Sequence, residues 1–318
     1  MKAISSLQVS LYFLPDDRRS QIEGGDDILA ETYASAEIER LRLRRRGMAG
    51  YGRELSDDWA AYPDDRNKPE SHYLKIEPIL NALSAWLQRQ TIQDASMGEE
   101  SATSIYLKVV EQLVAPRGAL QERFDANRDD LPNRISMIQK NFLEYARFEL
   151  VGSFPADKFM SIYQQASNHD RVSIRTVLMP YIEGLEARLD ALHETYSVLS
   201  NFSKIVNSFL SNKSMQIGIR RGVFIVSESG KAIEPNFLSS GEKQLLMLFS
   251  SVVLSRKRSY VFIIDEPELS LNVTWQRRLV KALLSCARGG ETQFIMASHS
   301  LELITQHRKS TVRLVSAD

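Results

Sequence analysis

The stretch between Leu238 and His299 constrains the fold more than any other, because three polar motifs there each adjoin an apolar run. The central motif is Asp265-Glu266, which follows the apolar run Val261 to Ile264. Such a run is typical of a central strand in a sheet that is covered on both faces. Open α/β sheets bind ligands at the carboxyl ends of their strands. The pattern therefore predicts an α/β sheet with two acids at its binding edge.

Two adjacent acids at a strand end can divide the work of a phosphate-transfer site. Asp265 can hold Mg²⁺ directly or through water, because this hard cation prefers oxygen ligands. Glu266 can orient or deprotonate an attacking water. The alternative is a pair of solvated loop acids, which the preceding apolar run disfavours.

The first of the three motifs predicts a helix start. Ser239 is followed three residues later by Glu242, the spacing of a capping box, and the apolar run Leu245 to Leu254 comes next. A helix N-terminus presents free N–H groups and the positive end of the helix dipole, which together favour an anion such as phosphate. A helix cap with no ligand is the alternative, and the motif alone does not separate the two.

The third motif repeats the arrangement of strand and polar end. Gln293 to Ala297 is predicted to be a short strand, and Ser298-His299-Ser300 follows it. A histidine at that edge can donate a hydrogen bond to a phosphate oxygen. A structural or merely exposed histidine is the alternative.

In this order the motifs resemble those of the ABC-type ATPase superfamily, nearest to its soluble RecF-like, SMC-like and OLD-like branch, which includes AAA-type proteins of phage-defence systems. The resemblance implies a signature motif at Leu238 to Gln244, with nucleotide contacts from Ser239, Ser240, Gly241 and Glu242. It makes Asp265 the Walker B aspartate, Glu266 the catalytic glutamate and His299 the switch histidine. Ser270-Leu271-Asn272 lies at the D-loop, where Asn272 replaces the usual His or Asp.

This resemblance implies an α/β fold: an incomplete ABC-type nucleotide-binding domain, with a largely parallel sheet and a large all-helical insertion. ATP and Mg²⁺ are the expected cofactors, and ATP-driven closure of a head-to-tail dimer is the expected mechanism. An effector protein and nucleic acid are further expected partners, and anti-phage defence is one biological setting that fits.

The sequence contains no P-loop of the form Gly-x-x-x-x-Gly-Lys-Ser/Thr. Gly241-Glu242-Lys243 lacks the second glycine, and Gly230-Lys231 is followed by Ala232. In ABC-type dimers each ATP lies between the P-loop of one subunit and the signature of the other, so this chain is expected to be inactive alone.

Two readings of the missing P-loop remain open. The chain is either the C-terminal part of a soluble ABC-type ATPase or a non-hydrolysing interaction subunit that lends Ser239 and Gly241 to a P-loop on a partner chain. A transporter ATPase is disfavoured, because the helical insertion at about 28–213 is longer than transporter insertions at this place.

We expect three regions: an N-terminal remnant of the ATPase lobe (1–27), a helical insertion (28–213) and a C-terminal ATPase lobe (214–318). Within them we expect strands at 9–14, 215–220, 223–227, 260–264, 292–297 and 311–315, and a loop at 20–27. The expected helices are 28–46, 73–93, 101–115, 119–127, 132–151, 155–168, 242–256, 273–287 and 301–307.

One long helix is predicted at 178–210 from a seven-residue apolar repeat. The repeat consists of Leu178, Ile182, Leu185, Leu189, Leu192, Tyr196, Leu199, Val206 and Leu210. The helix can serve as a coiled-coil arm or pack within its own domain. We favour packing, because the chain has no second heptad run of equal length to pair with it.

A run of arginines ends the predicted helix 28–46: Arg40, Arg42, Arg44, Arg45 and Arg46. It can contact a nucleic-acid backbone, but basic residues also complement the dipole of a solvated helix end, and we favour the second interpretation. Overall, 40 basic and 40 acidic residues cancel, so no global charge draws the chain to nucleic acid.

The cysteine and apolar content indicate a cytoplasmic protein. Cys286 is the only cysteine, so no internal disulfide can form. The longest apolar stretch, Leu245 to Leu254, is too short to span a bilayer. We therefore expect no membrane partner.

Overall fold

Three parallel strands and one antiparallel strand form the sheet in the computed structural model, which describes residues 10–14, 21–23, 76–98, 107–111, 130–256 and 260–313. The strand order is β2 (Gln21–Glu23), β1 (Ser10–Leu14), β6 (Tyr260–Asp265), β7 (Thr292–Ala297). β6 lies parallel to both β1 and β7, with Asp265 opposite Ala297. The predicted parallel sheet is confirmed, and it places the ends of β6 and β7 side by side.

Two expectations at the margins of the sheet are wrong. Residues 21–23 were expected in a loop but form β2, because they pair antiparallel with β1 and backbone pairing outweighs their polar composition. Residues 311–313, the start of the expected strand 311–315, are irregular, and they follow the 3₁₀ helix η3 (Arg308–Ser310). Residues 314–315 lie outside the described part of the chain.

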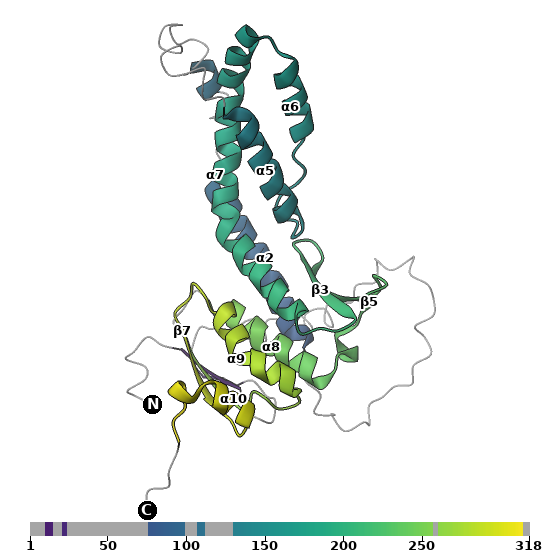
Figure 1. Ribbon diagram of the computed structural model, residues 1–318, viewed down its shortest axis with the longest axis vertical. Coiled ribbons are helices and arrows are strands. Elements are labelled where there is room, and N and C mark those ends of the chain that lie inside the picture. Colours follow the sequence, from purple (N-terminus) through teal and green to yellow (C-terminus); the bar gives the residue numbers. More distant parts are fainter. Residues whose placement is uncertain are drawn as a thin grey trace, which may run out of the picture. The chain divides into compact units, whose positions relative to one another are not determined.

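The chain divides into two compact units, and Figure 1 labels their helices α2 and α5 to α10. The sheet unit comprises Met1–Ala82, Ser208–Asn212 and Lys231–Asp318, and the helical unit comprises Leu83–Asn207 and Lys213–Gly230. Division of the chain into functional regions at 27 and 213 stays a prediction.

Three helices follow one another in the sheet unit: α8 (Ser240–Leu254), α9 (Val273–Cys286) and α10 (Leu301–Gln306), and α9 contacts both of the others. α8 is buried along most of its length, as expected for a helix that is apolar nearly all round. The short strand β5 (Ala232–Ile233) and the 3₁₀ helix η2 (Pro235–Phe237) precede it. Cys286, at the end of α9, is a buried free thiol.

The helical unit is built around α7 (Asn168–Asn207), which is packed along α5 (Leu131–Ala146). Arg134 on α5 donates to both carboxylate oxygens of Glu186 on α7, at 2.9 and 2.5 Å. The ring of Tyr145 on α5 stacks on that of Tyr196 on α7, with 4.2 Å between the ring centroids. α6 (Ala156–Gln165) contacts α5, and residues 83–98 of α2 (Glu77–Gly98) belong to the same unit.

The long helix begins earlier than predicted and contains Pro180. Its heptad positions Ile182, Leu189, Leu192, Leu199 and Val206 are buried. Because its apolar face contacts α5, the structure favours a helix packed in its own unit over a free coiled-coil arm. After it, β3 (Lys213–Gly218) and β4 (Gly222–Ser227) form the predicted antiparallel hairpin.

Several predicted elements lie outside the described residues, namely the helices 28–46 and 119–127 and the arginine run within the first. Of the predicted helix 101–115, residues 107–111 are described and are helical. None of the helices in the described ranges is long and apolar enough to cross a membrane.

Candidate functional site

The signature segment, residues 238–244, forms the predicted capping box at the start of α8. The Ser239 hydroxyl oxygen accepts a hydrogen bond from the Glu242 N–H at 3.3 Å, and the Ser239 N–H donates to Glu242 Oε2 at 2.8 Å. Ser239 and Ser240 are exposed, whereas Glu242 is buried. The exposed serines are therefore presented at a helix N-terminus, where N–H groups and the dipole favour an anion.

Gly241 is the point where α8 meets the loop after β6. A Cβ at this position would lie 2.6 Å from the carbonyl oxygen of Ser270 and 3.3 Å from the side chains of Leu271 and Trp275. Gln244, one turn along α8, donates from Nε2 to the Pro267 carbonyl at 3.3 Å. The absence of a side chain at Gly241 therefore allows the signature segment to approach the predicted D-loop.

The acid loop, residues 265–270, turns sharply through two residues in the left-handed region. Glu266 has φ 43° and Ser270 has φ 64°, and such backbone is costly for residues other than glycine. The Glu266 N–H donates to the Ala297 carbonyl at 2.9 Å, and the Leu269 N–H donates to the Glu266 carbonyl at 3.0 Å. These bonds hold Glu266 just past the end of β6 and next to the end of β7.

Glu268 ties the acid loop to the switch loop, residues 298–300. Its Oε1 accepts hydrogen bonds from the Ser298 hydroxyl at 2.6 Å and from the His299 and Ser300 N–H groups, both at 3.0 Å. Hydrogen bonds to an ionised acceptor are stronger than neutral ones. Sequence reasoning missed this residue. The sequence did contain a signal for it. Glu268 lies shortly after the predicted strand 260–264, and the N–H groups that precede the predicted helix 301–307 follow the neighbouring strand 292–297.

Glu266 and His299, the two residues expected to catalyse, are brought together. His299 Nε2 lies 3.9 Å from Glu266 Oε1. The His299 side chain is 92% exposed and that of Glu266 is 34% exposed. Both can therefore reach a ligand outside the sheet edge, while their backbones are fixed by the bonds to Ala297 and Glu268.

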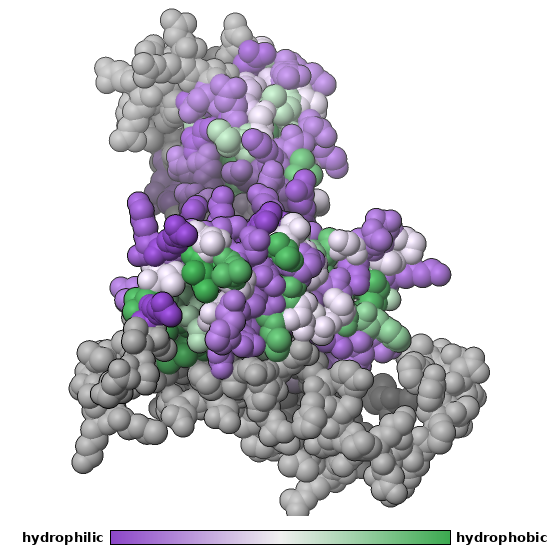
Figure 2. Space-filling model, turned by 60° about the horizontal axis from the view of Figure 1, so that its bottom comes forward, coloured by the Kyte–Doolittle hydropathy of each residue, from purple (hydrophilic) through white to green (hydrophobic). Residues whose placement is uncertain are grey.

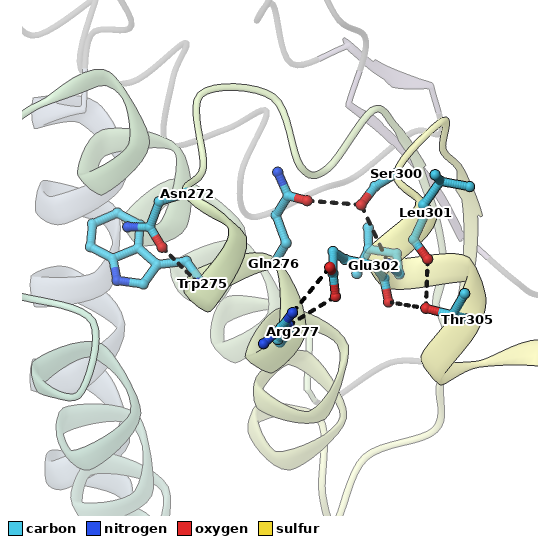
Figure 3. A network of polar contacts seen from close by, with 9 residues as sticks. Asn272, Trp275, Gln276, Arg277, Ser300, Leu301, Glu302 and Thr305 are labelled. Atoms are coloured by element: carbon cyan, nitrogen blue, oxygen red, sulfur yellow. Dashed lines mark hydrogen bonds and ion pairs between the residues drawn. The ribbon is translucent and has the colours of Figure 1, made fainter.

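Asn272 caps α9, since its Oδ1 accepts a hydrogen bond from the Trp275 N–H at 2.9 Å (Figure 3). It is not joined directly to Glu266 or His299. A chain of bonds runs instead through Gln276, which donates to the Leu271 carbonyl at 2.9 Å and accepts from the Ser300 hydroxyl at 2.8 Å. The predicted D-loop and switch loop are thus connected through α9.

A second link between α9 and α10 is the paired side chains of Arg277 and Glu302 (Figure 3). Arg277 Nε donates to Oε2 at 2.8 Å and Nη2 donates to Oε1 at 3.1 Å. The hydrogen bond from Arg277 lowers the pKa of the Glu302 carboxyl. This pair orients α10 directly after the switch loop.

Large apolar side chains are exposed beside the signature segment, the predicted D-loop and the switch loop. Phe237 precedes the signature segment and is 76% exposed, Val273 follows the predicted D-loop and is 50% exposed, and Leu301 follows the switch loop and is 77% exposed. Figure 2 shows apolar side chains at the surface of the described part, among polar ones. Single exposed apolar residues are normal on protein surfaces.

No group of three or more His, Cys, Asp or Glu side chains in the described ranges is arranged to hold a metal ion. Asp265 is the carboxylate predicted to bind Mg²⁺, with further ligands from phosphate oxygens and water. That is the way Mg²⁺ is commonly bound beside a nucleotide.

Residues 114–305 match the family described as "AAA domain, putative AbiEii toxin, Type IV TA system". This match covers more than half of the chain, and the chain belongs to that family. The family places it among the AAA- and ABC-type ATPases, so the resemblance found in its motifs is confirmed at that level.

No curated protein matches the chain. Among solved structures, it is similar to the Smc head domain with an extended coiled coil, bound to the C-terminal domain of ScpA, from Pyrococcus furiosus. Sequence identity is 12% and the TM-score is 0.30. The similarity covers 72% of this chain and 55% of the Smc chain, so the chain spans about half the length of that relative.

Replacement of Gly241 by alanine tests its packing against the acid loop. We expect Gly241→Ala to lower the free energy of unfolding by about 1–3 kcal/mol, because the new methyl group meets backbone that cannot move freely. Urea unfolding followed by circular dichroism measures it. Gly152→Ala is the matched control, since a Cβ there would meet nothing within 4 Å. Equal stability of the two variants would contradict the close approach.

Replacement of Glu268 tests the link between the loops. We expect Glu268→Ala to lower the free energy of unfolding by about 2 kcal/mol, because three donors lose a charged acceptor, and Glu268→Gln to cost less because the amide keeps one acceptor oxygen. Glu302→Ala is the control and should cost little, as an exposed ion pair. A Glu268→Ala variant as stable as the control would show that the loops hold without Glu268.

Proposed function

We propose that this chain supplies the signature half and the catalytic acids of a composite ATPase site, which becomes complete when a P-loop on another subunit meets its signature segment. The observation that carries the proposal is the pairing of Glu266 with His299 at 3.9 Å, beside a helix N-terminus with two exposed serines. An acid and a histidine at adjacent strand ends suit an attacking water and the phosphate that it attacks.

The roles follow from the chemistry of each group. Ser239, Ser240 and the N–H groups at the start of α8 contact the γ-phosphate of an ATP held by the partner's P-loop. Asp265 provides one ligand to the Mg²⁺ that neutralises the phosphates. Glu266 orients the water, and His299 donates a hydrogen bond to the γ-phosphate. Asn272 acts from the D-loop by fixing the start of α9.

The exposed apolar residues beside the motifs support a partner surface there. Phe237, Val273 and Leu301 adjoin the signature segment, the predicted D-loop and the switch loop, and burial of each against another subunit would favour association. We propose a head-to-tail arrangement, because the P-loop and the signature must come from different subunits. The family's printed description, a putative toxin of a Type IV TA system, fits ATP-driven control of an effector in defence.

The second candidate function is a non-hydrolysing interaction subunit. The observation that favours it is a signature segment whose capping box is complete and whose serines Ser239 and Ser240 are exposed. Such a subunit would promote ATP-dependent association with a P-loop-bearing partner, and Glu266 would not affect turnover.

Replacement of Glu266 distinguishes the two candidates. In a complex with a P-loop-competent partner, we expect Glu266→Gln to keep ATP-dependent association and to lower ATP turnover roughly 10²-fold or more, because the amide is a far poorer base. Steady-state phosphate release measures turnover. Glu228→Gln is the control, because Glu228 is an exposed acid directly after β4. Unchanged turnover in Glu266→Gln would favour the interaction subunit.

Replacement of Ser239 tests the signature contact. If Ser239 only caps α8, Ser239→Ala should cost about 1 kcal/mol of stability and nothing else. We expect in addition that ATP-dependent association with the P-loop-competent partner is lost, because the γ-phosphate loses its contact. Analytical ultracentrifugation with and without Mg-ATP measures association, and circular dichroism confirms folding.

A matched control exists for the cap. Ser167 accepts from the Asp170 N–H at 3.3 Å at the start of α7, so Ser167→Ala also removes a cap, in the helical unit. It should associate like the unmodified chain. Equal association by Ser239→Ala and Ser167→Ala would show that Ser239 only caps its helix, and would contradict its proposed contact with ATP.

A further inference from the structure

A cavity of about 390 Å³ lies in the helical unit, and none of its lining residues belongs to a motif of the proposed ATPase site. Its walls come from the C-terminal end of α5, the C-terminal part of α7 and both strands of the β3–β4 hairpin. The elements can be followed in Figure 1. The volume falls in the range of small-molecule pockets, which is roughly 300–1,000 Å³.

The two carboxylates of the cavity wall are already occupied by neighbours. Glu144 accepts a hydrogen bond from the Tyr196 hydroxyl, and this bond is the largest cause that lowers the pKa of Glu144. Glu149 accepts from the Arg220 N–H at 2.9 Å and pairs with Arg221 Nε at 3.6 Å. Nearby positive charges, those of Arg147, Lys140 and Lys204, also lower the pKa of Glu144, whereas Glu149 is paired with Arg221.

Gly218 makes the position of Glu149 possible. A Cβ on Gly218 would lie 2.9 Å from the Glu149 carboxylate. Any other residue at position 218 would therefore displace that carboxylate. Glu149 itself has φ 59°, a left-handed conformation that is costly for a non-glycine residue. The contacts with Arg220 and Arg221 thus hold this acid against the β3–β4 hairpin.

Two cations of the wall act on Glu144 through their charge but make no direct bond to it. Arg147, just after α5, and Lys204, on α7, make no hydrogen bond or close ion pair through their side chains with any described residue. Arginine offers five N–H donors in a planar fork and lysine three, and both suit phosphate oxygens. Lining hydroxyl groups of Ser200 and Ser203 add polar contacts nearby.

The remaining wall is apolar and aromatic. Phe148, Tyr196 and Phe224 all line the cavity, and aromatic rings give a flat ligand both apolar area and stacking geometry. A ligand that combines an anionic group with a planar ring matches both parts of the wall. Neither a purely apolar nor a cationic molecule would satisfy Arg147 and Lys204.

We propose that this cavity binds a small phosphorylated ligand with an aromatic ring, of the mononucleotide class, with its phosphate at Arg147 and Lys204 and its ring against the aromatic wall. The site is separate from the composite ATPase site and does not depend on a P-loop. Because the wall joins α5, α7 and the hairpin, the ligand would hold these elements together.

Isothermal titration calorimetry of the full 318-residue chain tests the site. Adenosine 5′-monophosphate, adenosine and inorganic phosphate are the probes. We expect one site per chain for the monophosphate, weaker binding of phosphate and no binding of adenosine, because the charge-assisted bonds need the anion. The monophosphate affinity should fall as ionic strength rises.

Variants assign the binding to the cavity. We expect the double variant Arg147→Ala/Lys204→Ala to weaken monophosphate binding at least tenfold, while Lys140→Ala, an exposed cation on α5 outside the cavity wall, leaves it unchanged. Lys204→Arg should retain binding. Ser239→Ala should also retain it, which separates this site from the proposed ATPase site. Circular dichroism checks that each variant is folded.

Three outcomes would overturn the proposal. The first is the absence of heat from both the monophosphate and phosphate at millimolar concentration. The second is an unchanged affinity in the folded double variant. The third is binding of a short single-stranded oligonucleotide without binding of either probe, which would make the cations part of a nucleic-acid surface.

Discussion

The carboxylate of Glu268 is the contact on which the candidate site depends. It belongs to the loop after β6, yet it accepts three hydrogen bonds from residues 298–300 after β7. Parallel strands end at the same edge but do not fix the loops beyond it, so a bond between loops is needed. Without it, His299 would have no backbone restraint from the acid loop and could move away from Glu266.

Close approach of backbone is the second constraint. The signature helix α8 can lie against the carbonyl of Ser270 only because residue 241 is glycine. Ser270 and Glu266 both adopt left-handed backbone, which the hydrogen bonds of the acid loop hold in place. The signature segment, the acid loop and the switch loop are therefore in contact with one another, and the apolar side chains of Phe237, Val273 and Leu301 beside them are exposed.

The helical unit depends on the pairing of α5 with α7. The bidentate bond from Arg134 to Glu186 and the stacked rings of Tyr145 and Tyr196 join the two helices near opposite ends of α5. At the second of these contacts the helices meet the β3–β4 hairpin, and the cavity forms there. The unit is thus more than a spacer, because its packing creates a charged and aromatic pocket of its own.

The sequence by itself determined the α/β class, the strands β1, β6 and β7, the capping box and the candidate residues, since periodicity and capping are local properties of the chain. Only the tertiary structure decided what depends on distant partners. It made residues 21–23 a strand through pairing with β1, left residues 311–313 irregular, and placed Glu268 against the switch loop. It also formed the cavity at Arg147 and Lys204, whose neighbours come from segments far apart in the sequence. No local pattern marks such contacts, because their energy arises only after the elements have packed.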